Sequence, residues 1–141
     1  AFEPIYDDRM VIALPLGHRL AEAGSIGLDA LQDTPLILPA RDTGNRLLID
    51  EAMAAARMVL NWTYEVGRAK TALELVADGL GAALVPQSAI GAGRVAMCEL
   101  ERPRISRPVG LLSRLGQQDV PAVTALKTAI RNVATPLETS Q

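Results

Sequence analysis

One stretch of the chain, residues 71–86 with the sequence TALELVADGLGAALVP, constrains the fold more than any other. Leu73, Val76 and Ala77 recur at helical spacing, which predicts a helix with one apolar face. Gly79 stands where this helix would end, because glycine enters the left-handed conformation without penalty. Leu80 follows at the position where this helix-ending motif favours an apolar contact.

Both ends of this stretch carry further signals. Thr71 followed by Glu74 fits a capping box, which predicts that the helix begins at Thr71. The apolar run 82–85 lies between a glycine and Pro86, so it predicts a short buried strand that the proline ends. The stretch therefore combines a helix, a glycine turn and a buried strand, which is half of a parallel α/β repeat.

The remainder of the chain alternates in the same way. A helix is predicted over residues 45–58, and a last helix capped by Asp119 has Pro121 in its first turn and ends at Pro136. Residues 1–8 are interpreted as an extended connector and residues 16–27 as a loop. Short helical turns are expected at 29–32 and 87–91, and strands at 10–14, 36–38, 62–66, 95–100 and 109–113. This alternation predicts an α/β fold with a mostly parallel sheet whose faces are covered.

The last helix has two contrasting sides. One side forms an apolar stripe, and the opposite, polar side is expected to face water. The stripe consists of Val123, Leu126, Ile130 and Val133, and the polar side of Lys127, Thr128, Arg131 and Asn132.

Composition excludes several classes of function. The chain has 141 residues, a formal charge of −2 and a pI near 5.4, so this segment carries no basic footprint for nucleic acid. No segment approaches the ~18 apolar residues of a membrane span. The single cysteine, Cys98, cannot form an internal disulfide, which fits a reducing compartment. It lies in a predicted strand and is expected to be a buried apolar residue, not a reactive thiol.

Three strings, in register along the chain, resemble one family. The string LVADGLGAALVP at 75–86 is similar to a glycine-rich signature in the effector-binding domain of LysR-type transcriptional regulators. MVIALPLGHRLA at 10–21 is similar to that family's strand followed by P-x-x-H-P-L-A, with Arg19 in place of the second proline. LDALQDTPLILP at 28–39 is similar to its L-x-x-L-x-x-x-P-x-I element.

The resemblance implies the two-lobed fold of type-II periplasmic binding proteins, with Rossmann-type, three-layer αβα lobes. Residues 8–99 would form one complete lobe, subdomain II. Residues 1–7 and 100–141 would be crossover segments and the returning strand and helix of subdomain I, which is incomplete here. The last helix is then expected to expose an apolar patch or to make a rearranged contact.

The resemblance also implies partners and a location. DNA would be bound through a winged helix-turn-helix that is not present in this chain, and the whole protein would be a cytoplasmic homodimer or homotetramer. A small-molecule effector is expected, and a cofactor or a membrane is not. A solute-binding protein of a transporter outside the cytoplasm, with the same fold, is the alternative.

Two strand-to-helix connections are the candidate effector site. In open α/β sheets, ligands bind beyond the carboxyl ends of the strands, and helix N-termini favour anions. The resemblance places both connections in a cleft between lobes. The alternative is that Asp42, Thr43 and Thr71 only cap helices and that the cations are solvated. The candidate residues are Ala40, Arg41, Asp42, Thr43 and Gly44 in the first connection, and Gly67, Arg68, Ala69, Lys70 and Thr71 in the second.

Catalysis has little support in the sequence. The only histidine, His18, lies in a glycine-flanked turn, and no G-x-S-x-G elbow is present for a nucleophile. Gly79 and Gly81 follow a helix and precede a strand, the reverse of a nucleotide-binding turn. We therefore predict no catalytic residue, no metal site and no enzyme.

Overall fold

The computed structural model describes residues 1–91 and 93–139. The chain divides into two compact units, one of Arg9–Ile105 and one of Ala1–Asp8 with Ser106–Gln141. The assignment of residues 8–99 to a complete lobe of a larger domain stays a prediction.

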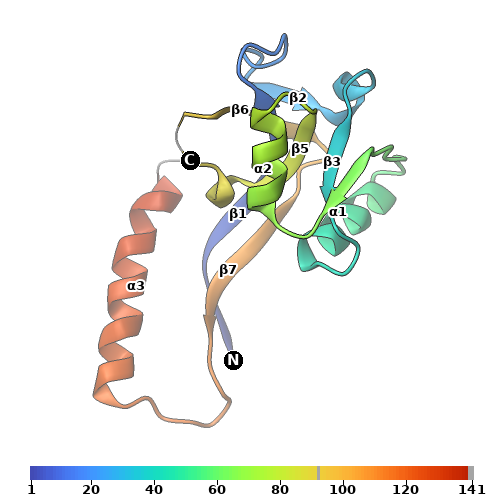
Figure 1. Cartoon of the computed structure of the whole chain (residues 1–141). Coiled ribbons are helices and arrows are strands. Elements are labelled where there is room, and N and C mark those ends of the chain that lie inside the picture. Colours follow the sequence, from blue (N-terminus) through green and yellow to red (C-terminus); the bar gives the residue numbers. More distant parts are fainter. Residues whose placement is uncertain (92, 140–141) are drawn as a thin grey trace. The chain divides into compact units, whose positions relative to one another are not determined.

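The larger unit is built on a mixed sheet (Figure 1). Its strands follow the order β2-β6-β1-β5-β3-β4, where β1 contributes its residues from Arg9 onward. The pairs β2–β6, β3–β4 and β3–β5 are parallel, whereas β1 runs antiparallel to β5 and β6. The bounds are β1 Phe2–Pro15, β2 Ser25–Gly27, β3 Leu36–Pro39, β4 Tyr64–Val66, β5 Ala82–Pro86 and β6 Val95–Arg102.

The central strands are buried on both faces, which explains their nearly continuous apolar sequences. Along β1, Met10 and Ile12 belong to one core cluster and Val11 to the other, as the two-residue period of a strand requires. Ile12 lies opposite Leu84 of β5 and opposite Cys98 of β6. The strands predicted at 10–14, 36–38, 82–85 and 95–100 are confirmed.

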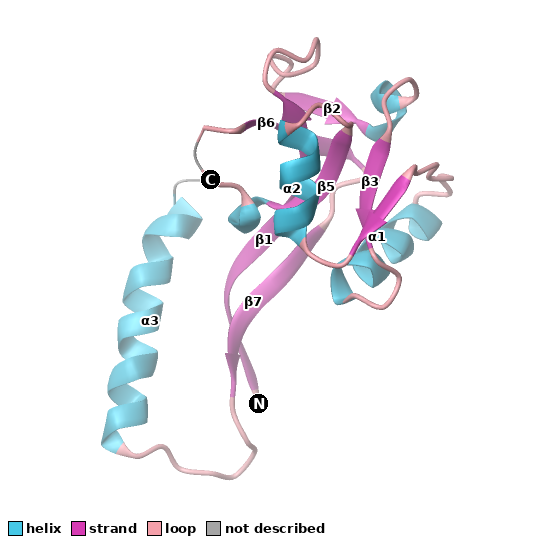
Figure 2. Ribbon diagram, in the orientation of Figure 1, coloured by secondary structure: helices cyan, strands magenta, loops and turns pink. Residues whose placement is uncertain are grey.

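Helices cover the two faces of this sheet (Figure 2). The α-helix α1, Gly44–Ala55, places Ile49 and Met53 in one cluster, together with the 3-10 helix η1, Leu28–Leu31. The α-helix α2, Ala69–Ala77, places Ala72 and Val76 in the other. A second 3-10 turn, η2, spans Gln87–Ala89. Each fully buried aliphatic side chain of this kind contributes about 1.5–3 kcal/mol to stability.

The predicted glycine stop after α2 is confirmed. Gly79 has φ +83°, its amide donates to the Val76 carbonyl at 2.9 Å, and the Leu80 amide donates to the Leu75 carbonyl at 3.0 Å. This pair of hydrogen bonds defines a Schellman motif. Helix α1 ends through the same motif with Arg57 in the left-handed conformation at φ +54°. It therefore stops at Ala55, before the predicted end at residue 58.

The predicted capping box at the start of α2 is wrong. Helix α2 begins at Ala69, two residues before Thr71, and no side chain caps it. The Ala72 amide already donates to the Arg68 carbonyl at 3.2 Å, so Thr71 lies inside the first turn. Strand β4 ends at Val66, and only two residues separate it from this helix, which leaves no room for a later start.

Other element bounds also differ from the prediction. Strand β2 was not predicted, because its three residues, the last of them a glycine, carry too little alternation to indicate a strand. Trp62 and Thr63 precede β4, although they were expected to belong to it. Residues 2–8 belong to the long strand β1 and not to a connector.

The smaller unit contains the first residues of β1, the strand β7 at Ser106–Leu112 and the α-helix α3 at Pro121–Thr139. Strand β7 pairs with β1. Ala1 and Ser113 exchange two hydrogen bonds, of 2.6 Å from the Ala1 amino group and 2.8 Å from the Ser113 amide. Arg131 of α3 binds both carboxylate oxygens of Glu3, at 2.6 and 2.7 Å.

Helix α3 presents the side that was expected to face water to this strand pair. Lys127 is mostly buried and donates to the Ser113 hydroxyl at 2.9 Å and to the Asp119 carboxylate. On the other side, Leu126 is 60% and Val133 72% exposed. The predicted exposed apolar patch is therefore confirmed, whereas the predicted water-facing side is wrong for Lys127 and Arg131.

The ends of α3 also differ from the prediction. The carbonyl that starts the helix is that of Val120, which accepts from the Thr124 amide at 3.1 Å. Asp119 binds Lys127, so it is not the predicted cap. The helix continues past Pro136 to Thr139, so this proline does not end it as predicted.

A pair of glycine substitutions tests this account of the turn between α2 and β5. A Cβ at position 81 would clash with the carbonyl oxygen of Pro35, which accepts the Ala82 amide at 2.9 Å. At Gly79 a Cβ meets open space, and only the left-handed backbone opposes it. We expect Gly81→Ala to cost about 3 kcal/mol of unfolding free energy in urea denaturation and Gly79→Ala about 1 kcal/mol. Equal losses would contradict the steric argument.

Candidate functional site

The two predicted connections lie beside each other at one edge of the sheet. Strands β3 and β4 are parallel, so the segments that follow them emerge on the same edge. The Ala40 amide donates to the Val66 carbonyl at 2.8 Å and joins the two strand ends directly. A hollow of about 40 Å³ opens between them.

Four of the ten predicted residues line this hollow, namely Thr43, Gly67, Arg68 and Ala69. The others, which are Ala40, Arg41, Asp42, Gly44, Lys70 and Thr71, do not line it. The prediction missed lining residues that belong to strands and helices and not to the two loops. These are Pro39, Asn45, Val66, Ala72, Leu84, Val85 and Pro86. Leu84, Val85 and Pro86 belong to β5, so they could have been predicted only from a strand order that places β5 beside β3.

Thr43 caps helix α1, as one of the two interpretations of the sequence held. Its hydroxyl accepts from the Arg46 amide at 3.2 Å and donates to the Ala40 carbonyl at 2.7 Å. A threonine hydroxyl has a single hydrogen to donate, so it has none left for a ligand in this arrangement. Thr43 therefore shapes the loop.

The N-terminus of α2 differs from that of α1 because it has no side-chain cap. Its first-turn amides have no intrahelical acceptor, and no side chain caps them. The exposed Arg68 occupies the N-cap position, and Lys70 is exposed in the first turn. Backbone amides, the helix dipole and cationic side chains together favour an anion at this end.

A buried arginine beneath the two connections was not predicted. Arg46 of α1 is 4% exposed. Its Nη1 donates to the Pro39 carbonyl at 3.0 Å and to Glu65 at 2.8 Å, and its Nε donates to Asp50 at 3.0 Å. The guanidinium carbon lies 5.3 Å from the centroid of the Trp62 ring. No periodic signal identifies such a residue, because its position on the helix resembles that of a solvated cation.

These contacts shift the pKa values of Arg46 and Glu65. Burial opposes the charge of Arg46, but the hydrogen bonds that it donates to Glu65 and Asp50 outweigh this effect, so its pKa is raised. The pKa of Glu65 is lowered, mainly by the hydrogen bond from Arg46. Arg41 adds a weaker contact to Glu65 at 3.4 Å, and its guanidinium lies 5.8 Å from the Trp62 ring centroid. Arg41, predicted as a ligand contact, is thus directed toward Glu65 and Trp62.

Comparison with known proteins identifies the family. The LysR substrate binding domain model matches residues 1–135. The chain belongs to this family. The chain is 38% identical over 120 residues to a probable hydrogen peroxide-inducible genes activator of Mycobacterium avium, which covers 79% of this chain and 37% of that protein. It is 31% identical over 139 residues to the transcriptional regulator GalR of Pseudomonas putida, covering 94% of this chain and 34% of GalR. The chain thus spans about a third of the length of these curated relatives.

Solved structures show the same fold. The effector binding domain of QuiR, solved with shikimate, matches with a TM-score of 0.72 at 22% identity, covering 100% of this chain and 66% of that one. HinK of Pseudomonas aeruginosa, a LysR family regulator, matches with a TM-score of 0.77 at 20% identity, covering 97% and 49%. The predicted fold, of type-II periplasmic binding proteins, is confirmed.

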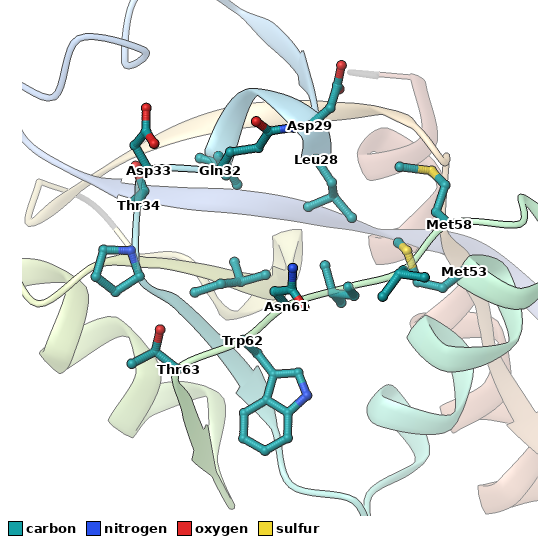
Figure 3. A pocket seen from close by; sticks show the side chains of 15 residues that line it. Leu28, Asp29, Gln32, Asp33, Thr34, Met53, Met58, Asn61, Trp62 and Thr63 are labelled. Atoms are coloured by element: carbon teal, nitrogen blue, oxygen red, sulfur yellow. The ribbon is translucent and has the colours of Figure 1, made fainter.

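A larger groove of about 670 Å³ lies at the opposite, amino ends of β3 and β4 in this LysR domain (Figure 3). Its lining includes two carboxylates, Asp29 and Asp33, and no lysine, arginine or histidine. In Figure 3 both carboxylates point away from Met53 and Met58. This groove therefore offers an anion two carboxylates and no cationic side chain among its lining residues, and the loop edge is the better candidate for an anionic effector.

The single cysteine of this LysR domain is not disposed to react. Cys98 is fully buried, and its Sγ contacts the Leu20 carbonyl at 3.0 Å. Burial, as the largest effect, raises the pKa of the thiol.

The single histidine also has a structural contact. His18 accepts a hydrogen bond from the Leu20 amide at 3.1 Å. Among the described residues no cluster of three potential metal ligands occurs, and no helix is long and apolar enough to cross a membrane.

The Arg46–Glu65 pair predicts a specific acid sensitivity. A carboxyl whose pKa is lowered by folding stabilises the folded state above its ordinary pKa, 4.5 for Glu65, and this contribution is lost as the pH falls through the lowered value. We therefore expect Glu65→Gln to be less stable than the wild type at pH 7 and to lose less stability on acidification. Thermal unfolding between neutral and acid pH measures both effects. The control is Glu51→Gln, an exposed change on helix α1, which also carries Arg46. This variant is expected to behave as the wild type.

The burial of Cys98 predicts slow thiol chemistry. The folded chain is expected to react with a thiol-specific disulfide reagent only through opening of the sheet, because the thiolate is the reactive form and here it is disfavoured. Labelling in buffer should thus be at least about a hundredfold slower than labelling in denaturant. Rapid labelling of the folded chain would contradict the structural role of this residue.

Proposed function

We propose that this domain senses a small anionic metabolite for a DNA-binding regulator, and that the anion binds where the connections after β3 and β4 meet. The observation that carries the proposal is the hollow between them. There the uncapped N-terminus of α2 and the exposed Arg68 lie beside the capped N-terminus of α1. Backbone amides at such a terminus bind carboxylates and phosphates without further help.

The related structures support a small ligand. QuiR was solved with shikimate, and the regulatory domain of CcmR with 2-PG. The CcmR domain matches this chain with a TM-score of 0.75 at 18% identity, covering 96% of this chain and 67% of that domain. Closure of a second lobe over this edge remains part of the proposal, and the exposed apolar side of α3 would then be buried inside that lobe, to which α3 is assigned.

The regulatory mechanism would be a shift between conformations. A ligand favours the arrangement that it binds more tightly, and coupling of about 1–3 kcal/mol is usual for such systems. DNA would be bound by a winged helix-turn-helix outside this chain, in a cytoplasmic homodimer or homotetramer. A transporter's solute-binding protein is not favoured, because the matched relatives are transcriptional regulators. No catalytic step is proposed, since the described residues around the hollow include no acid–base pair or nucleophile.

Substitution of Arg68 tests the anion site. In the full-length protein, we expect Arg68→Ala to weaken the binding of the effector about tenfold or more, because a hydrogen bond to a charged group contributes about 1.5–3 kcal/mol. DNA binding without effector should be unchanged. Calorimetric titration with a panel of small carboxylates and phosphates, including shikimate and 2-PG, identifies the effector and measures both affinities.

Two controls keep the result specific. Arg104→Ala removes an exposed arginine between β6 and β7 and is expected to leave the affinity unchanged. Thr43→Ser retains the cap of α1, whereas Thr43→Ala loses it and costs about 1 kcal/mol of stability. If the Arg68→Ala and wild-type proteins bind the effector equally, the anion site is not at this edge.

A further inference from the structure

Arg46 links the ends of the two strands that carry the proposed site. Its Nη1 donates at 3.0 Å to the carbonyl of Pro39, the last residue of β3, and at 2.8 Å to the carboxylate of Glu65 in β4. The segment after Pro39 contains Thr43, and the segment after β4 contains Arg68. A single nitrogen atom therefore joins the two strands immediately before the residues that line the hollow.

The same residue also fixes the start of α1. The Arg46 amide donates to the Thr43 hydroxyl at 3.2 Å, and that hydroxyl donates to the Ala40 carbonyl. The backbone and side chain of one residue thus determine the path of the whole first connection. The planar guanidinium suits this role, because its donors have fixed relative directions.

The neighbouring side chains make weaker or more local contacts. Arg41 also reaches Glu65, but at 3.4 Å and with a side chain that is 74% exposed. Asp50 binds the Nε of Arg46 within the same helix, four residues along, so this contact does not join α1 to the sheet. The Trp62 ring, 5.3 Å from the guanidinium carbon, adds a cation–π contact.

We infer that Arg46 is a positioning residue of the proposed site, which sets the distance between the connections after β3 and β4 without contacting the ligand. This inference rests on the proposed function for its consequence in ligand binding. The positioning is reported by the hydrogen bond of 2.8 Å from the Ala40 amide to the Val66 carbonyl, which joins the two connections. The stability of this hydrogen bond can be measured without any ligand.

Amide hydrogen exchange on the 141-residue chain tests the inference. In Arg46→Gln, a shorter side chain that cannot hold both acceptors, we expect the Ala40 amide to exchange about tenfold faster relative to the Val11 and Val85 amides of the central sheet. Arg46→Lys keeps the charge and is expected to give a smaller increase. Asp50→Asn removes the charge of one partner of Arg46 but changes neither acceptor on the sheet, so it is the matched control and should leave the ratio unchanged.

Titration with inorganic sulfate connects positioning to the site. Backbone amide shifts of Gly67 and Ala69 report binding, and we expect Arg46→Gln to weaken sulfate about threefold or more while Asp50→Asn has no effect. If neither Arg46 variant changes the relative exchange of Ala40, or if Asp50→Asn changes it as much, the inference is overturned. If Ala40 responds as expected but the wild type shows no sulfate-induced shifts, Arg46 positions the connections and the proposed anion site is wrong.

Discussion

The larger unit depends on one strand that is buried on both faces. Strand β1 lies between β5 and β6, and its residues alternate between two separate core clusters. A change at Ile12 therefore disturbs one helix-covered face, and a change at Val11 disturbs the other. This constraint leaves the middle of the sheet no room for polar groups, so the chemistry of the chain is confined to the sheet edges and the connections.

Strand direction then decides where that chemistry gathers. Strands β3, β4 and β5 are parallel to one another, so their carboxyl ends meet at one edge together with the N-termini of α1 and α2. Helix dipoles and first-turn amides are concentrated there, whereas the larger groove at the amino ends has carboxylates at its rim. The smaller opening is therefore better suited to an anion than the larger one.

The sequence predicted the parts of this fold that depend on local signals. Apolar runs identified the buried strands, and Gly79 identified the end of α2, because both signals act within a few residues. The start of α2 was mistaken, since the short connection from β4 overrode a plausible capping box. The orientation of α3 was mistaken because one of its contacts, that of Arg131 with Glu3, joins residues more than a hundred positions apart.

The sequence led to the two connections that meet at the candidate site but not to most of the residues that line it. The general rule for open sheets led to both connections, but which of their residues line the hollow depends on packing that no local pattern encodes. Arg46 was missed for the same reason. Its burial arises from acceptors on two strands, and the one that is nearer in sequence, Pro39, offers only a backbone carbonyl.

The indole beside Arg46 makes the domain optically informative. Trp62 is the single tryptophan of the chain, and the guanidinium groups of Arg41 and Arg46 lie within 5.8 Å of its ring centroid. Indole emission responds to nearby charge and to solvent. The tryptophan emission of the folded domain therefore reports from one place only, at the join between α1 and the edge strand β4.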